Sequence, residues 1–340
     1  MNKNIIPALV LVLALPGLAQ ELQPPKVHGY LSLGYFTGQA DSPYSKGSVE
    51  GLGAGLFFLG DLSDKFSYTL EARFTSDSRV EIEQALVSFT ASEVFRLTAG
   101  AFLVPFGKYN LANRPYETRL IMKPLVLERA YPDSWRELGA QESGKLGFLN
   151  AVVYIGNGLA ESASVAQGQQ FQDNNANKAW GGRLSLQPGR GMDIGVSYYL
   201  GKYDALDQRN LKLVGADASW TTQDFQVLAE YVKAENQNPA PFAKGVVEGY
   251  FIQLAFNYQS FFPVVSYQRV RQDDPFHGPG WAAPDVPGQG LLAKKARWAL
   301  GLAYLLTPNF QIKAEYDFNL EPSGPTLKDN LLIIQSVVNF

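Results

Sequence analysis

The sequence alternates between apolar and polar residues with a period of two along most of its length. Residues 66–74 read FSYTLEARF and residues 310–318 read FQIKAEYDF, so every second side chain in each segment is apolar. Successive side chains of a β-strand point to opposite faces of a sheet. The period therefore predicts an all-β fold whose strands have one apolar and one polar, often charged, face.

Sixteen segments of about ten residues carry this pattern, although strand counts of 14 and 18 stay open. A tilted strand of about 9–11 residues is long enough to cross a bilayer. The uncharged stretch 249–268 is interpreted as parts of two strands joined near Gln259 and Ser260, because polar residues and Pro263 interrupt it. The predicted strands are 27–36, 49–60, 66–74, 81–90, 94–103, 138–146, 148–156, 179–187, 192–201, 210–220, 224–234, 246–258, 262–271, 296–305, 310–318 and 331–340.

The connections between these strands alternate in length. Those after odd-numbered strands are long, such as 37–48, 104–137 and 272–295, and those after even-numbered strands are short, such as 91–93 and 221–223. Bacterial outer-membrane barrels have short periplasmic turns and longer external loops. The sequence therefore predicts a transmembrane antiparallel β-barrel, with apolar side chains facing lipid and both chain ends on the periplasmic side.

The N-terminus has the layout of a secretory signal peptide. Lys3 precedes an apolar stretch from Ile5 to Leu15, and small residues stand before a cleavage point after Ala19. The stretch is too short to span a membrane as a helix, which needs about 20 residues. We predict a cleaved signal peptide at 1–19, a single barrel domain at 20–340 and a place in the bacterial outer membrane.

The last predicted strand ends the chain on Phe340, with Leu332, Ile334 and Val338 on the same face. A terminal aromatic residue on the lipid-facing side is what such barrels present to the barrel-assembly machinery. We interpret Phe340 as that assembly signal.

Composition excludes several other classes of protein. The 340 residues include no cysteine and two histidines, which rules out disulfides and cysteine-ligated metals. The 29 Lys and Arg against 32 Asp and Glu give a net charge of −3. Nucleic-acid binding needs a dominant basic surface, so we do not expect it. We also expect no metal and no other cofactor.

One hairpin resembles a known family. Residues 85–89 read ALVSF and residues 96–107 read RLTAGAFLVPFG, which looks like the hairpin characteristic of the phosphate-selective porins O and P. Residues 249–255 and 312–316 are similar to later strands of that family. The resemblance implies a sixteen-stranded porin, a homotrimer, that passes small anions such as phosphate, or other solutes, by diffusion. A phosphate-preferring channel and a general porin both stay open.

The connection 104–137 is the candidate constriction, because it follows the fifth strand, as does the loop that folds inward in general porins. Its six basic and four acidic residues give a local charge of +2. Basic side chains that ring a pore favour anions. The alternative is a solvated external loop with internal ion pairs. The candidate constriction residues are Lys108, Arg114, Arg119, Lys123, Arg129 and Arg136.

The polar faces of the strands are expected to line the lumen. Aromatic residues near strand ends on the apolar faces, such as Tyr198, Tyr250 and Phe310, predict an interfacial girdle rather than a sugar-stacking track. The candidate lumen residues are Glu71, Arg73, Arg96, Arg183, Asp193, Arg297, Lys313, Glu315 and Asp317.

Two other functions stay open: an outer-membrane barrel enzyme of the lipase type, and a surface or adhesion barrel that conducts no ions. His277 lies beside Asp273 and Asp274 in a predicted external connection, but no serine stands in a G-x-S-x-G elbow. A histidine in a polar loop is far more often a surface residue. Conductance in a planar bilayer separates a porin from an adhesion barrel.

The porin interpretation predicts that the purified protein does not hydrolyse esters. We expect the wild type and His277→Ala to give the same background rate in an esterase assay, because neither would contain an activated serine. Hydrolysis that is abolished by His277→Ala would contradict this interpretation.

Overall fold

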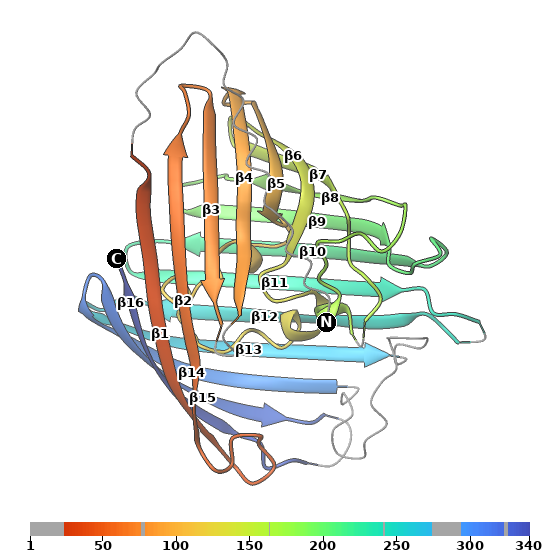
Figure 1. The fold of residues 1–340 in the computed structure, drawn as a ribbon. Helices are drawn as coiled ribbons and strands as arrows, with labels where there is room; N and C mark the ends of the chain where they lie inside the picture. The colour runs from red at the N-terminus through yellow and green to blue at the C-terminus, as the bar shows by residue number, and fades with distance from the viewer. Residues whose placement is uncertain (1–23, 76–78, 163, 241, 274–293, 323–325) are drawn as a thin grey trace, which may run out of the picture.

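The computed structural model describes residues 24–75, 79–162, 164–240, 242–273, 294–322 and 326–340. They form one closed barrel of sixteen antiparallel strands, in which β1 (Lys26–Gly38) pairs with β16 (Leu331–Asn339) (Figure 1). The predicted all-β barrel and its strand count are confirmed. The predicted signal peptide at 1–19 and His277 lie outside the described residues.

The strand boundaries follow the period-two pattern closely, and no predicted boundary differs from the observed one by more than two residues. Three short helices lie in the described parts of the connections: η1 (Tyr109–Leu111), α1 (Leu127–Ala130) and η2 (Val165–Gln167). No helix in the described part of the chain is long and apolar enough to cross a membrane. The other strands are β2 (Ser48–Asp61), β3 (Phe66–Phe74), β4 (Val80–Ser92), β5 (Phe95–Leu103), β6 (Arg136–Leu146), β7 (Leu149–Gly156), β8 (Ala179–Leu186), β9 (Met192–Lys202), β10 (Asn210–Thr221), β11 (Phe225–Asn236), β12 (Gly245–Phe256), β13 (Phe261–Asp273), β14 (Lys294–Thr307) and β15 (Phe310–Leu320).

Backbone hydrogen bonds join the first strand to the last and close the sheet. Gly29 N donates to Phe340 O at 2.8 Å, and Phe340 N donates to Gly29 O at 2.9 Å. The pairing continues from Tyr30 opposite Asn339 to Gly38 opposite Leu331. Because an unpaired backbone group in hydrocarbon costs several kcal/mol, closure of the sheet is what allows strands to cross a bilayer. The role of Phe340 in assembly stays a prediction.

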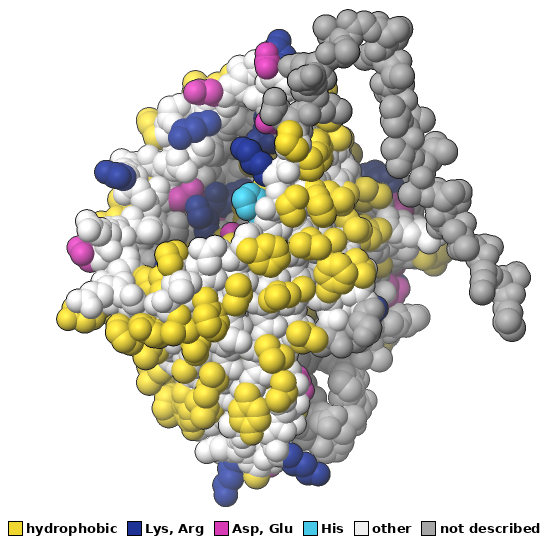
Figure 2. Space-filling view, turned by 60° about the vertical axis from the view of Figure 1, so that its left-hand side comes forward, with side chains coloured by type: hydrophobic (Ala, Val, Ile, Leu, Met, Phe, Trp, Pro, Cys, Tyr) yellow, Lys and Arg dark blue, Asp and Glu magenta, His cyan; other side chains and the backbone are white. Residues whose placement is uncertain are grey.

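The apolar face of each strand is the outer one. In β15, Gln311, Lys313 and Glu315 point inward and are buried, whereas Ile312 and Phe318 are exposed on the outside. Figure 2 shows apolar side chains across the outer surface and basic side chains inside a hollow. A soluble sheet has the opposite arrangement, with its apolar face packed away from water. The outer surface is therefore that of a protein surrounded by lipid.

Short and long connections gather at opposite ends of the barrel, as the sequence predicts. Residues 93–94, 147–148 and 222–224 are short connections at one end, and residues 104–135 and 157–178 are long ones at the other. In outer-membrane barrels the short turns are periplasmic. We therefore call the two ends periplasmic and extracellular, and the described chain begins and finishes at the periplasmic end.

Gly100 of β5 allows a close approach between two strands. Its φ is +128°, and a Cβ there would meet the carbonyl oxygen of Ala85 on β4. Gly147, in the β6–β7 turn, also has a positive φ of +61°, but the space around it is open. Of these two glycines, Gly100 is the one at which a side chain would meet both backbone strain and a steric clash.

Gly100→Ala should therefore lower the free energy of unfolding by about 2–3 kcal/mol, and Gly147→Ala by about 1 kcal/mol. The midpoint of urea unfolding in lipid vesicles, followed by tryptophan fluorescence, measures the difference. Equal midpoints for the two variants would show that the close approach at Gly100 does not limit stability.

Candidate functional site

The connection between β5 and β6 folds into the lumen. It comprises residues 104–135 and includes η1 and α1. The side chains of Phe106, Tyr131 and Trp135 are fully buried, which an external loop in water would not allow. The alternative of a solvated external loop is therefore wrong, and we call residues 104–135 the inward loop. The predicted connection extended to 137, whereas Arg136 is already the first residue of β6.

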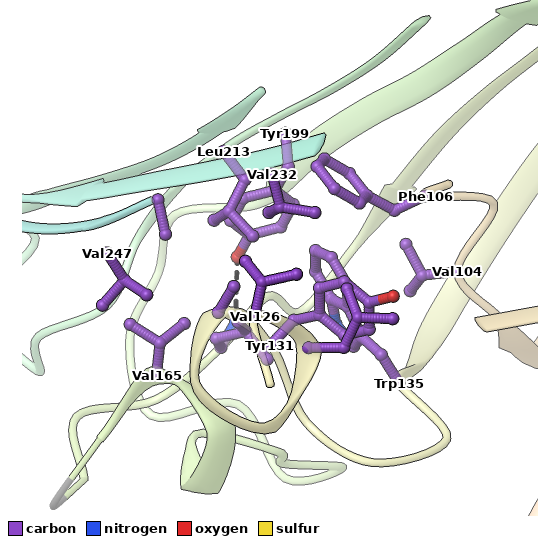
Figure 3. Close-up of a cluster of buried hydrophobic side chains, with 14 of the residues drawn as sticks. Val104, Phe106, Val126, Tyr131, Trp135, Val165, Tyr199, Leu213, Val232 and Val247 are labelled. Atoms are coloured by element: carbon purple, nitrogen blue, oxygen red, sulfur yellow. Dashed lines mark hydrogen bonds between the residues drawn. The ribbon is translucent and has the colours of Figure 1, made fainter. Parts of the chain in front are cut away.

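Aromatic packing holds the inward loop against the wall formed by β7 to β13. Trp135 stacks on Tyr131 with ring centroids 5.5 Å apart and meets the edge of Tyr199 from β9 at 5.1 Å. Figure 3 shows these rings beside the wall residues Leu213 and Val232. Burial of an apolar side chain contributes roughly 1.5–3 kcal/mol, so a cluster of this size fixes one side of the loop.

Wall carboxylates bind the backbone of the inward loop. Tyr109 N donates to Glu230 Oε2 at 2.9 Å. Met122 N donates to Glu315 Oε2 at 3.0 Å, and Ile121 N donates to the same oxygen. A hydrogen bond of this kind contributes about 0.5–1.5 kcal/mol, so these two carboxyl groups anchor two separate parts of the loop.

Two further wall residues complete this attachment. Leu125 N donates to Gln268 Oε1 of β13 at 3.0 Å. The Lys313 ammonium of β15 donates to Pro115 O at 2.8 Å. The loop is thus held by its main chain at several points along its length.

The inward loop leaves open space on both of its sides. Towards the extracellular end, a cavity of about 450 Å³ lies between the loop and β1 to β4, with Gln335 of β16 also in its lining. Towards the periplasmic end, a cavity of about 470 Å³ is lined by the loop, the 187–193 segment and residues of β10 to β12. We call them the extracellular and periplasmic cavities. A sixteen-stranded barrel is wide enough for an aqueous channel, and the loop is what narrows this one.

The charged residues of the extracellular cavity are matched in sign. Arg114 of the loop binds Glu71 of β3 with two hydrogen bonds, of 2.9 and 2.7 Å. Lys123 Nζ lies 3.9 Å from Asp133 Oδ1 and 4.8 Å from the Tyr131 ring centroid. The charged residues that line this cavity are Arg73, Arg114, Lys123, Glu71, Glu83 and Asp133.

Arg73 and Arg136 share a pair of carboxylates on β4. Arg73 Nε lies 2.7 Å from Glu83 Oε1 and its Nη2 lies 2.8 Å from Glu81 Oε2. Arg136 approaches the same two groups at 3.2 and 3.4 Å. Two guanidinium groups thus face two carboxylates, so this part of the lumen is close to neutral.

Two of the remaining candidate constriction residues, Lys108 and Arg119, line the periplasmic cavity. Lys108 Nζ lies 3.3 Å from Asp193, and 37% of its side chain is exposed. The Arg119 guanidinium lies 4.2 Å from the centroid of the Phe262 ring. Within the described part of the chain, no carboxylate lies within 4.0 Å of Arg119, and its Nε is buried without a hydrogen-bond partner.

Other candidate lumen residues form ion pairs within the wall. Arg183 Nε donates to Asp217 Oδ2 at 3.0 Å, and the same guanidinium also binds Asp193. Arg96 is exposed near the periplasmic end of β5, on the inward side with Thr98, and so lies away from the narrowing.

The inward loop and β15 both contact one arginine of β14. Arg297 of β14 lies 3.4 Å from Asp317 and 3.3 Å from Glu128 of the loop. Arg129 follows in α1 and is half-buried. These charges contribute to the attachment of the loop, and the candidate list therefore mixes structural residues with residues that face the channel.

Sequence reasoning did not include Glu230, Gln268, Glu81 or Asp217 among the site residues. All four lie on the inward faces of their strands, as their contacts with the loop or with inward arginines show. Alternation along β11 and β13 contained that signal, because Glu230 shares its face with Gln226 and Asn236, and Gln268 shares its face with Ser266 and Gln272.

Burial affects the basic groups of the inward loop. Desolvation lowers the pKa of the Lys123 ammonium below its usual value, although the negative charges of Asp133 and Glu128 oppose the shift. Desolvation also lowers the pKa of Arg119. A guanidinium starts from a value so high that it stays protonated at neutral pH, so Arg119 contributes a full positive charge.

An apolar outer surface, a closed sixteen-stranded sheet and an inward loop with open space on either side define an outer-membrane porin, a water-filled diffusion channel for small solutes. The family model described as phosphate-selective porin O and P matches residues 52–211. The resemblance that the 85–107 hairpin indicates is thereby confirmed over that part of the chain.

Solved structures with the same fold are distant in sequence. The anion-selective porin from Comamonas acidovorans is 12% identical, with a TM-score of 0.65 over 93% of this chain and 98% of that one. Salmonella typhi OmpF in complex with daunomycin is 13% identical, with a TM-score of 0.66 over 93% and 97%. The trimer form of Vibrio cholerae OmpT is 10% identical, with a TM-score of 0.62 over 93% and 99%. A comparison with curated protein sequences found no match.

The attachment of the inward loop predicts the effect of removing Glu315. Glu315→Ala deletes the acceptor for two loop amides, so we expect residues 115–125 to loosen and the open-channel current to become noisier. Single-channel recording in a planar bilayer measures this, with limited proteolysis as a second readout.

Asp224→Ala is the matched control for that experiment, because Asp224 is an exposed carboxylate in the β10–β11 connection. It should leave both readouts unchanged. If Glu315→Ala behaves like this control, the carboxylate does not hold the loop.

Proposed function

We propose that this porin prefers small anions over cations and that the preference arises in the periplasmic cavity. Three cations face this cavity: Lys108, Arg119 and Arg190. Two carboxylates, Glu117 and Asp193, face it as well. The three cations outnumber the two carboxylates, even before the cationic partners of these carboxylates are counted.

Both carboxylates already have cationic partners outside the cavity lining. Glu117 Oε2 lies 3.2 Å from Arg114 Nη1, which is also bound to Glu71. Asp193 is bound to Arg183 as well as to Lys108. Their charge is therefore largely balanced, and the field within the cavity is positive.

Arg119 is the single observation that carries the proposal. Its guanidinium is placed by the Phe262 ring rather than by a carboxylate; Nε is buried, so the two Nη groups are the donors that remain for an anion. A guanidinium matches phosphate and carboxylate groups with two parallel hydrogen bonds. Charges placed at a narrowing act on every ion that passes.

The matched charges of the extracellular cavity support a diffusion channel rather than a dedicated phosphate carrier. Each of Arg73, Arg114 and Lys123 is near a carboxylate, so the described residues of that side offer no run of unpaired cations that would lead an anion inward. The names of the matched family and of the Comamonas acidovorans porin both mention anions, which supports the sign of the preference. We propose that chloride and phosphate both pass.

We propose further that the chain works as a homotrimer without enzymatic activity, after removal of residues 1–19. Vibrio cholerae OmpT, of the same fold, has a trimer form. Exposed apolar residues such as Leu33, Val49 and Ile82 on the outer face of β1 to β4 offer a surface suited to a second copy. The mass of the purified complex and its N-terminal sequence, expected to begin at Gln20, test assembly and processing together.

Arg119→Gln should reduce the permeability ratio of chloride to potassium by about threefold. Two unit charges about 6 Å apart in water interact by roughly 0.7 kcal/mol, and this attraction is lost with the guanidinium. The measurement is the reversal potential in a KCl gradient, repeated with added phosphate.

Arg209→Gln is the control, because Arg209 lies in an extracellular connection and pairs with Glu161 at 2.7 Å. It should leave the ratio unchanged. A wild-type channel that prefers potassium would overturn the proposed anion preference, and strong block of chloride current by phosphate would instead indicate a phosphate-dedicated site.

A further inference from the structure

A small cavity lies on the outer surface of the barrel, away from the channel. Its volume is about 180 Å³, and it opens near the extracellular end of β11, β12 and β13. Its lining residues are Tyr231, Glu248, Gly249, Tyr250, Arg269 and Arg271. Two arginines on the lipid-facing side of a membrane barrel need a physical explanation, because basic side chains are costly there except near the interfaces.

The register of β13 places both arginines on the outer face. Gln268 and Val270 point into the lumen, where they are buried and Gln268 binds the inward loop. Arg269 and Arg271 alternate with them and are exposed. They therefore face the surroundings of the barrel and cannot take part in conduction.

A row of aromatic side chains shows how deep the cavity lies. Tyr250, Tyr267 and Trp298 form a continuous outward row, with ring centroids 6.2 and 4.8 Å apart. Tyrosine and tryptophan gather at the level of the lipid headgroups. Arg269 and Arg271 stand two and four residues beyond Tyr267, about 7 and 14 Å further along the strand in the direction of its extracellular end. Their guanidinium groups thus lie at the headgroups of the outer leaflet.

The positive charge of the cavity is only partly matched. Arg271 lies 3.4 Å from Glu248, whereas Arg269 has no carboxylate within 4.0 Å among the residues that the structure describes. Lys212 and Lys233 also lie on the outer faces of β10 and β11, where Lys212 lies over the outward Tyr198 ring and Lys233 is paired with Glu235 at 2.7 Å. This margin therefore offers an anionic ligand more cations than the cavity alone contains.

Another part of the outer surface differs at the same level. Exposed outward residues near the extracellular ends of β6 to β8 are apolar there, as Leu138, Ile155 and Trp180 illustrate. Membrane depth by itself therefore does not demand basic residues. The basic margin on β10 to β13 is a local feature, which indicates a local ligand.

We propose that the cavity binds a phosphate group of a glycolipid headgroup in the outer leaflet. Arginine pairs with phosphate through parallel hydrogen bonds, and the two tyrosines place hydroxyl groups beside that position. The ligand is a membrane lipid because the cavity opens towards the bilayer and not into the lumen. The proposal does not depend on the anion preference of the channel.

The test is binding of bis-phosphorylated lipid A to the detergent-solubilised full-length protein, followed by native mass spectrometry. Arg269→Gln with Arg271→Gln should weaken binding by roughly tenfold or more, because each arginine supplies charge-assisted hydrogen bonds. Dephosphorylated lipid A should bind the wild type and the double variant equally weakly. Single-channel conductance of the double variant should stay at the wild-type value.

The control carries Lys65→Gln with Lys145→Gln, which removes two exposed cations at the periplasmic end and should leave lipid binding unchanged. Arg269→Gln alone serves if the double variant does not fold, as judged by its heat-dependent migration in gels. Unchanged lipid A affinity in the arginine variants would overturn the proposal. So would displacement of the lipid by millimolar inorganic phosphate, or a loss of oligomers with unaltered lipid binding, which would indicate a contact between copies of the chain.

Discussion

The requirement that every backbone N–H and C=O be paired within hydrocarbon governs this molecule. A chain of alternating residues cannot form a buried helix core, but it can form a sheet, and a sheet in lipid must close on itself. The hydrogen bonds between Gly29 and Phe340 provide that closure. Once closed, the sheet has an inside that must accept the polar half of every strand, and a polar interior too wide to be filled by wall side chains contains water.

The inward loop adds a second set of backbone groups that need partners. Some of them pair within the loop's own turns, and others are satisfied by Glu230, Glu315 and Gln268 from the wall. The aromatic cluster around Trp135 adds apolar contact on the side of β7 to β13. The loop therefore lies against one half of the wall, and open space is left beside β1 to β4 on its extracellular side and beside β10 to β12 on its periplasmic side.

The strands could be predicted because their signal is local. The pattern at 66–74 marks β3 to the residue, and the inward positions of Lys313, Glu315 and Asp317 follow from alternation alone. Short helices such as α1 carry no such period, and Leu127–Ala130 did not stand out in the sequence. The closed barrel also excludes the strand counts of 14 and 18 that the sequence left open. Its sixteen strands each pair with their neighbours in the chain.

The roles of the basic loop residues could not be predicted, because they depend on partners distant in the sequence. Arg114 binds Glu71, 43 positions away, and Arg297 meets Glu128, 169 positions away. Arg119 resembles both in the sequence, yet an aromatic ring lies against it instead. Only the path of the folded loop determines whether a cation forms an ion pair that stabilises the structure or faces an ion that passes through the channel.

The attachment of the loop through its main chain has an evolutionary consequence. Glu230 and Glu315 bind the amide groups of Tyr109, Ile121 and Met122, and these groups are present whatever side chains stand at those positions. Substitutions that redirect the loop's side chains towards other solutes can therefore accumulate while its path through the barrel is retained. Selectivity and architecture can then diverge at different rates, which is consistent with a shared fold among proteins that are 10–13% identical in sequence.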